Sequence, residues 1–507
     1  MARDAEYLKE HLQYVEWPGE KTQTEVAEAN IALLTTEIAK LAVLRQREVS
    51  VLATLRAMAA PVTKLPIELL IEIFKLVVHT EILGFALEWD RLFDHHAGST
   101  ALKKILPLLQ VSRHWRQVVH TTPGLWAEGV IELHRDRVFL SGSYKEGLEV
   151  LLARSARSPI SLSLYQGQSA APFFEGIVAR TADRLLNLSI HLPSFPQLDL
   201  CSRAFEALER LLIADMEWQE NPVTVFQHSP QLKHLVFCSV DSQSKIGLFH
   251  MPWGQLTVLT IVDESLGACR EALMQCTSLV AARITTSHLW DCPLEAAQTS
   301  VVELPFLEAL TVVFSGQPRH NEIGGLEAFL SPFALPFLRS LNIRFDCDSS
   351  ENWPVQVFHD FQLRSPNITD LKFNFCPLEA ENLIDILRQC VCLESLRLAY
   401  AFRCLTEDFL RAFTYNESNT TLAPQLQSIT LYAVCCHVSC GSLLEEAIRS
   451  RWWTDATLLS RTAPPRVKCL KEVAIFDSDF SEQFEDSVQD LEEQGLLHWY
   501  WNVLLEH

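Results

Sequence analysis

A six-residue pattern of apolar side chains recurs from residue 185 onward, and it constrains the fold more than any other feature of the sequence. The first five matches start 23 or 24 residues apart, and the later ones start 25 to 44 residues apart. The last two apolar positions of the pattern are two residues apart, which places them on one face of a short strand. Each match is therefore predicted to be one strand of a repeating unit. The pattern, apolar-x-x-apolar-x-apolar, starts at eleven positions: Leu185, Leu208, Leu232, Leu256, Leu279, Leu307, Leu338, Ile368, Leu393, Leu426 and Leu470.

Segments with helical spacing lie between the predicted strands, for example EALMQC, ENLIDILRQC and EDFLRAF. The early period lies within the range of about 20 to 29 residues typical of leucine-rich repeats. A strand followed by a helical return predicts an α/β fold, a curved solenoid of leucine-rich-repeat-like type with parallel strands over residues 155–480. Ile160, Leu162 and Leu164 fit an irregular first strand, and residues 481–507 are predicted to cap the end. A general α/β domain is the alternative.

Residues 24–60 are predicted to form one long amphipathic helix, preceded by an N-terminal tail at 1–23. Arg45 and Glu48 occupy two seam positions of its heptad register, so a continuous parallel coiled-coil dimer is only weakly specified. The helix is expected either to dimerise or to pack on the chain's own next domain. The other a and d positions of that register are apolar: Ile31, Leu34, Ile38, Leu41, Leu52 and Leu55.

A small helical module is predicted over residues 61–130. Pro66 suits the first turn of a helix in the string LPIELLIEIFKLVVHT, whose apolar face holds Leu69, Ile73, Leu76 and Val77. Residues 79–100 have weaker periodicity and are predicted to be an inserted loop. Helical spacing then resumes in LKKILPLLQVSRHWRQVVHTTPGLW.

Three clusters of residues in this module carry a family resemblance. They are Leu65, Pro66, Glu68, Leu69, Ile71, Ile73 and Phe74; then Pro107, Leu108, Leu109, Val111, Ser112, Trp115, Val118 and Val119; and then Thr122, Pro123, Leu125 and Trp126. In this order they resemble an F-box. With the coil that precedes them and the closing TPGLW string, they are similar to the F-box proteins abundant in mushroom-forming fungi. The insert at 79–100 is longer than the connection in the shortest F-boxes.

The resemblance implies that residues 65–126 dock on a Skp-type adaptor of a cullin (SCF-type) ubiquitin ligase, while the repeats bind an unidentified protein substrate. It implies no catalytic role and no cofactor. A protein-binding leucine-rich-repeat scaffold without a ligase role is the alternative, and an unrecognised hydrolase is a second. The positions that match the family's docking contacts are Leu65, Pro66, Ile71, Ile73, Val111 and Trp115.

Length and charge oppose several other classes of function. A chain of 507 residues exceeds the size of one hydrophobic core, so several domains or a solenoid are expected. The opening MARDAEYLKE has no signal-peptide character, and no run of about 18 uncharged apolar residues exists, so a cytoplasmic or nuclear protein without a membrane span is expected. The net charge of -21, without a cluster of lysine or arginine, opposes binding to nucleic acid.

Motifs for catalysis or metal binding are absent or weak. The sequence holds no GxxxxGK[ST], GxGxxG, HExxH or GxSxG string. Its one cluster of soft metal ligands is Cys435, Cys436, His437 and Cys440, which lacks a second ligand pair at zinc-module spacing, so structural thiols are favoured. The neighbouring His95 and His96 are assigned to a solvated loop. No metal, cofactor or enzymatic activity is therefore predicted.

Overall fold

The computed structural model of the chain contains two units, residues 1–73 and 74–507, and each unit is described by itself. The predicted insert, with His95 and His96, and the cluster from Cys435 to Cys440 lie outside the described residues. The described residues are 20–59, 61, 65–78, 101–127, 130–134, 142–165, 171–191, 205–214, 222–239, 246–286, 301–315, 322–345, 353–401, 403–416, 421–433, 441–453, 465–476, 482–493 and 495–500.

Helix α2 (Glu20–Ala59) dominates the first unit. It matches the long helix predicted for residues 24–60, and every side chain from Gln23 to Arg56 is exposed. Helix α3 (Ile67–Val78) follows, and the boundary between the two units falls inside it.

Three short helices open the described part of the second unit after α3: α5 (Ala101–Val111), α6 (Arg113–Thr121) and α7 (Pro123–Ala127). Ser112 ends α5 and caps α6, because its hydroxyl accepts a hydrogen bond from the amide of Trp115 at 3.1 Å. Trp126 is buried in α7, and its indole Nε1 donates to the carbonyl of Val119 at 2.8 Å. These contacts tie the end of the module to its centre.

A parallel sheet of 14 strands, hydrogen-bonded almost entirely in chain order, forms most of the second unit. The eleven predicted strands are confirmed as β3 to β7, β9 and β11 to β15, and Ile160 to Leu164 lie in β2, so the mixed α/β class is confirmed. The strands are β1 (Val130–His134), β2 (Ile160–Tyr165), β3 (Leu185–His191), β4 (Arg210–Ala214), β5 (His234–Cys238), β6 (Val258–Val262), β7 (Ala281–Thr286), β9 (Ala309–Phe314), β11 (Ser340–Phe345), β12 (Asp370–Asn374), β13 (Ser395–Ala399), β14 (Ser428–Tyr432), β15 (Glu472–Phe476) and β16 (Leu497–Tyr500).

The register of the sheet aligns the same position of the pattern in each strand. Leu341 of β11, for example, pairs with Leu310 of β9 and with Leu371 of β12, and all three side chains are almost fully buried. The third apolar position aligns in the same way, as Ile343 pairs with Val312 and Phe373. The pattern therefore produces two continuous apolar rows that run across the strands.

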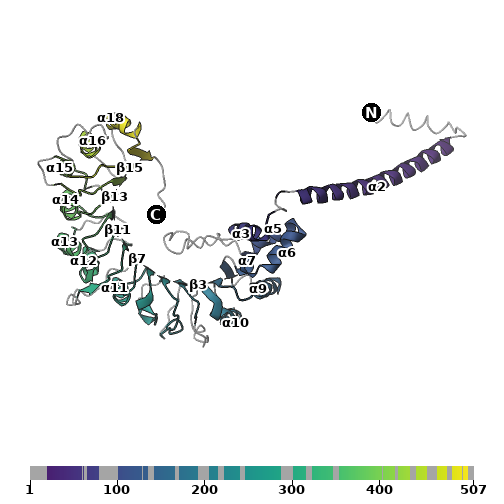
Figure 1. Cartoon of the computed structure of the whole chain (residues 1–507), viewed down its shortest axis with the longest axis horizontal. Coiled ribbons are helices and arrows are strands. Elements are labelled where there is room, and N and C mark those ends of the chain that lie inside the picture. Colours follow the sequence, from purple (N-terminus) through teal and green to yellow (C-terminus); the bar gives the residue numbers. More distant parts are fainter. Residues whose placement is uncertain are drawn as a thin grey trace, which may run out of the picture. The chain divides into compact units, whose positions relative to one another are not determined.

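Helices cover the face of the sheet that carries these rows. In Figure 1 the strands line the inner side of the curved sheet, and the helices from α10 to α16 lie along its outer side. The predicted EALMQC, ENLIDILRQC and EDFLRAF helices are confirmed as α11, α14 and α15. The helices are α9 (Gly142–Arg154), α10 (Ala171–Thr181), α11 (Leu266–Gln275), α12 (Glu322–Leu330), α13 (Val355–Arg364), α14 (Ala380–Gln389), α15 (Glu407–Phe413), α16 (Gly441–Ser450) and α18 (Glu482–Glu493).

Shorter elements complete the described chain: the 3-10 helices η3 (Ala182–Arg184), η5 (Ile246–Leu248) and η6 (Trp253–Gln255), and a two-stranded sheet of β8 (Val302–Glu303) and β10 (Phe333–Ala334).

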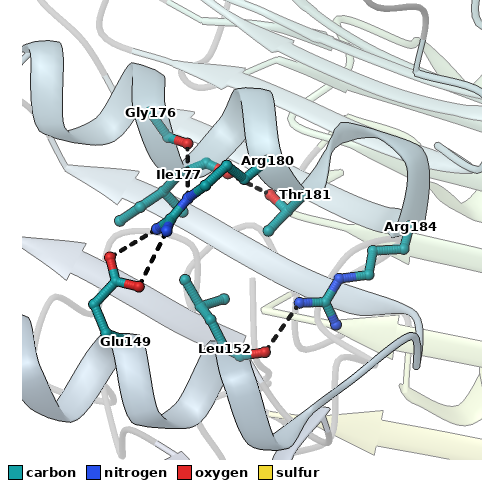
Figure 2. A network of polar contacts seen from close by, with 7 residues as sticks. All are labelled: Glu149, Leu152, Gly176, Ile177, Arg180, Thr181 and Arg184. Carbon is teal, nitrogen blue, oxygen red and sulfur yellow. Dashed lines mark hydrogen bonds and ion pairs between the residues drawn. The ribbon is translucent and has the colours of Figure 1, made fainter.

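Polar contacts join neighbouring helices of the outer layer. Figure 2 shows Arg180 of α10, whose guanidinium donates to both carboxylate oxygens of Glu149 in α9 at 2.7 and 3.1 Å. Arg184 of η3 donates to the carbonyl of Leu152 at 3.3 Å. The Arg180–Glu149 pair is half exposed, so it aligns the two helices more than it stabilises them.

Arg451 is a large polar side chain buried within the far end of the unit. Its guanidinium donates to the carbonyls of Phe413, Leu422 and Ala423 at 2.9, 2.6 and 3.3 Å, and lies 4.0 Å from the centre of the Phe413 ring. Burial lowers the pKa of Arg451 to about 10, so the side chain stays charged at neutral pH. One cation therefore supplies a donor to the carbonyls of Phe413 and Leu422, and a second donor to the carbonyl of Ala423, which also accepts from the amide of Leu426.

We predict that Arg451→Ala lowers the free energy of unfolding by about 3 to 5 kcal/mol, because the buried carbonyls of Phe413 and Leu422 lose their side-chain donor. Denaturant unfolding followed by circular dichroism measures the change. Arg388→Ala is the control, since Arg388 forms an exposed pair with Asp385 and its loss is expected to cost less than about 1 kcal/mol. Equal effects of the two substitutions would contradict the prediction.

Candidate functional site

The inner face of the sheet carries the side chains that alternate with the buried rows. The residue between the last two apolar positions of each pattern lies at the centre of this face, and we name these residues the central row. Paired strand by strand, the central row is Ser189, Leu212, Val236, Thr260, Arg283, Thr311, Asn342, Lys372, Arg397, Thr430 and Ala474.

The first part of the central row is buried. Ser189, Leu212, Val236 and Thr260 are each less than 8% exposed, at 7%, 2%, 4% and 6%. Around them on β4 to β6 lies a small apolar cluster that is separate from the main core: Leu212, Ala214, Val236, Cys238 and Val262. A partner cannot reach these side chains directly, so the first strands do not offer an open recognition surface.

The middle of the central row is accessible and polar. We name Arg283, Thr311, Asn342, Lys372 and Arg397 the polar window; the first four are half-buried and Arg397 is exposed. The described strands that carry it, β7, β9, β11, β12 and β13, contain four basic residues and one acidic residue. The local charge of this face is thus opposite to the net charge of the chain, which is -21.

Two neighbours of the polar window on β12 define its chemistry further. The ammonium of Lys372 lies 3.3 Å from the carboxylate of Asp370, and the two side chains are 33% and 32% exposed. The Oδ1 atom of Asn374 is buried and accepts no hydrogen bond within the described part of the chain. Lys372 is therefore paired within its own strand, and the Oδ1 atom of Asn374 is closed to a partner.

Aromatic side chains follow the polar window at the carboxyl ends of its last strands. Phe375 and Tyr400 stack with ring centres 4.0 Å apart, and Tyr432 meets Tyr400 at 5.2 Å. Phe375 and Tyr400 each follow a strand directly and adopt a left-handed backbone, with φ of 51° and 52°. Their amides continue the parallel ladder by donating to the carbonyls of Ala399 and Tyr432. Asp263 after β6 and Ala433 after β14 adopt the same left-handed backbone and make the same ladder bond, so this conformation is a recurring feature of the strand ends.

Four of the predicted docking residues lie in the first unit. Leu65 and Ile71 are half-buried, Pro66 is exposed, and the side chain of Ile73 is 42% exposed. Helix α3 itself has two apolar sides. It buries Leu70, Phe74 and Val78, whereas Leu69, Ile73 and Leu76 leave 53%, 42% and 78% of their surface exposed.

The remaining two docking residues lie in the second unit, one exposed and one packed. Val111 at the end of α5 is 59% exposed, and Leu106 on the same helix is 50% exposed. Trp115 is half-buried and meets the ring of Phe74 edge-on, with the ring centres 4.7 Å apart. Trp115 therefore belongs partly to the core of its own module. Sequence reasoning did not include Leu76 or Leu106 among the docking residues, although each differs from its buried neighbours only in helical phase.

A polar cluster borders this module where α6, α7 and α9 approach one another. The guanidinium of Arg154 lies 4.5 Å over the Trp126 ring and 2.9 Å from the Nδ1 atom of His120. Burial, and then the charges of Arg154 and Arg116, lower the pKa of His120. At neutral pH this imidazole is therefore neutral and accepts from Arg154.

One described cavity bears on the hydrolase alternative. It measures about 250 Å³ and lies between η5, η6 and α11. His250 and Glu271 line it, but none of its lining residues is a serine, threonine, cysteine or lysine. Among the described residues, no group of three or more histidines, cysteines and acidic residues is placed to hold a metal ion. This cavity gives the hydrolase alternative no support.

Comparisons with known proteins do not assign the chain to a family. No protein-family model matches the chain, and no curated protein matches it in sequence. In the described part of the chain, every helix is too short or too polar to span a lipid bilayer.

We predict that the buried thiols of Cys276 and Cys404 resist alkylation, because burial raises the pKa of each to about 12. At pH 9 a pKa of about 12 leaves roughly one thiol in a thousand ionised, and the thiolate is the reactive form. Iodoacetamide labelling followed by peptide mass mapping measures this. Cys392, which is half-buried, serves as the reactive control, and both buried thiols should label after unfolding in guanidinium. Rapid native labelling of Cys276 would contradict the prediction.

Proposed function

We propose that the chain is the substrate-recognition subunit of a cullin ubiquitin ligase of the SCF type, acting in the cytoplasm or the nucleus. In this proposal the F-box-like residues 65–126 dock on a Skp-type adaptor, and a leucine-rich-repeat-like solenoid binds the protein substrate. The chain itself carries out no chemistry. Strands in chain order, with an α-helix in most of the connections between them, support the solenoid part of the proposal.

The two apolar sides of α3 are the observation that carries the docking role. A helix that buries Leu70, Phe74 and Val78 has already satisfied the packing of its own module. The further exposure of Leu69, Ile73 and Leu76 costs solvation free energy unless a partner covers them. Apolar residues at positions i, i+4 and i+7 are the usual anchors of a helix that enters a groove on a partner.

A distinct observation indicates what the repeats would bind. The polar window places Lys372 and Arg397 next to each other on the adjacent strands β12 and β13. The aromatic rings of Phe375 and Tyr400 stack immediately beyond them. Cations beside aromatic rings favour a peptide segment that carries carboxylates. We therefore assign the substrate an acidic segment.

The docking role predicts that Ile73→Asp with Leu76→Asp abolishes binding to a Skp-type adaptor. Both side chains are exposed, so the double variant should fold, whereas Ile71 is half-buried and a charge there risks unfolding the module. Replacing two interface anchors by carboxylates is expected to weaken binding at least about a hundredfold. Co-purification and isothermal titration with the full chain measure the effect.

Leu363→Asp with Val391→Asp is the matched control, since these side chains are also exposed, at 65% and 54%, but lie on the outer layer of the sheet. This variant should bind the adaptor like the original chain. If the original chain binds no Skp-type adaptor, the ligase role is wrong and the scaffold alternative is favoured.

The recognition surface predicts that a labelled decaglutamate peptide binds the full chain in a salt-dependent manner. Lys372→Glu with Arg397→Glu should weaken that binding by about tenfold or more, because two neighbouring cations of the window become anions. Fluorescence anisotropy measures the affinity. The control is Arg388→Glu with Arg411→Glu, which changes the same net charge on the exposed outer helices. Equal losses from both variants would show that only net charge matters, and would contradict the assignment.

A further inference from the structure

Helix α2 exposes a continuous apolar seam. Between Ile31 and Leu55 the a and d positions of one heptad register hold six large aliphatic side chains and two charges. All six aliphatic side chains are between 46% and 66% exposed. Of the large aliphatic residues elsewhere in this stretch, only Leu33 and Val43 lie on the outer c and f positions. A helix of this kind is stable when a second helix covers the seam.

The two charges in the seam decide how a second copy can pair. Arg45 occupies an a position and Glu48 the next d position, and both are exposed. In a parallel dimer, a faces a and d faces d, so Arg45 would meet Arg45 and Glu48 would meet Glu48. Two like-charge contacts in successive layers oppose that arrangement.

In an antiparallel dimer an a position faces a d position, so the like-charge contacts are replaced by contacts between opposite charges. In the register centred between Gln46 and Arg47, Arg45 faces Glu48 of the second copy, and by the twofold symmetry Glu48 faces Arg45. The layers on either side then pair Leu41 with Leu52 and Ile38 with Leu55. A shift of one heptad in either direction places Arg45 and Glu48 against leucine or isoleucine instead, so one register is favoured over its neighbours.

The residues beside the seam also favour the antiparallel arrangement in this register. Leu44 and Val51 both occupy g positions, which face each other in an antiparallel pair, and their side chains are 55% and 45% exposed. Around the central ion pairs they would form an apolar border that limits access of water. Leu44 and Val51 would remain half-covered in a parallel pair, where g faces e.

We infer that α2 binds α2 of a second copy of this chain as an antiparallel coiled coil, with its register set by two Arg45–Glu48 pairs. The overlap runs from Leu34 to Ala59, about 39 Å at 1.5 Å per residue. The two copies leave this overlap at opposite ends. Each dimer thereby presents two docking modules and two recognition surfaces, which raises the effective affinity for a partner with repeated sites.

Charge reversal in the full chain tests the pairing, with sedimentation equilibrium as the measurement. The original chain should form a dimer at micromolar concentration. Arg45→Glu and Glu48→Arg should each raise the dissociation constant by about tenfold or more, since each places like charges in both central layers. The double variant should recover the original value. Arg47→Glu, at the outer c position, is the control and should leave the dimer unchanged.

Cysteine cross-linking tests the orientation. A mixture of a Leu41→Cys chain and a Leu52→Cys chain should form a disulfide between the two different chains, identified by mass mapping of the peptides. Leu41→Cys alone should form no cross-link at position 41. Three results would each overturn the inference. They are a disulfide that joins position 41 of two Leu41→Cys chains, an original chain that is monomeric, and a dissociation constant that no charge reversal changes. None of these outcomes bears on adaptor docking, which is measured through α3.

Discussion

The in-register parallel ladder is the interaction on which the rest of the structure depends. Each strand between the two edge strands pairs with a neighbour on both sides, and the same pattern position meets itself from one strand to the next, as Leu310, Leu341 and Leu371 do. A short strand between long connections could not hold this backbone alone. Its stability comes from the neighbouring strands and from the helix that covers the apolar rows. The register therefore fixes which side chains are buried and which project from the inner face.

Because the ladder is made by backbone groups and the core by the apolar side chains, the side chain between the apolar positions is free to vary. Leucine, valine, threonine, arginine and lysine all occupy the central row without any change in register. The apolar side chains on the outer face are needed for folding, whereas the side chains on the inner face can vary. The left-handed residues Phe375 and Tyr400 show the same separation, since their amides serve the ladder while their rings stack with each other.

Much of the fold was predictable because its strands repeat a local rule. All eleven strands that obey the six-residue pattern were found where the pattern lies. The end strands β1 and β16 were missed because neither carries a full pattern, and a strand at the edge needs only one partner. The central row was also readable as the single residue between two apolar positions. The sequence did not predict which residues of the central row are accessible. Thr260 and Thr311 are the same residue type at the same pattern position, but only Thr260 is buried. Their burial depends on contacts distant in the chain.

Net charge was the weakest guide, because a sum over the chain carries no information about position. The chain carries a net charge of -21, yet the charged residues of the polar window, Arg283, Lys372 and Arg397, are all cations. Exposure of apolar side chains is more informative, because it has a location. Of the 27 large apolar residues that are exposed in the described chain, 19 lie on α2, α3 and α5, and eight are scattered over the rest. Scattered residues need no explanation, whereas a concentration on three helices is typical of a surface that a partner covers. Under the functions proposed above, assembly is assigned to the N-terminal helices and recognition to the sheet.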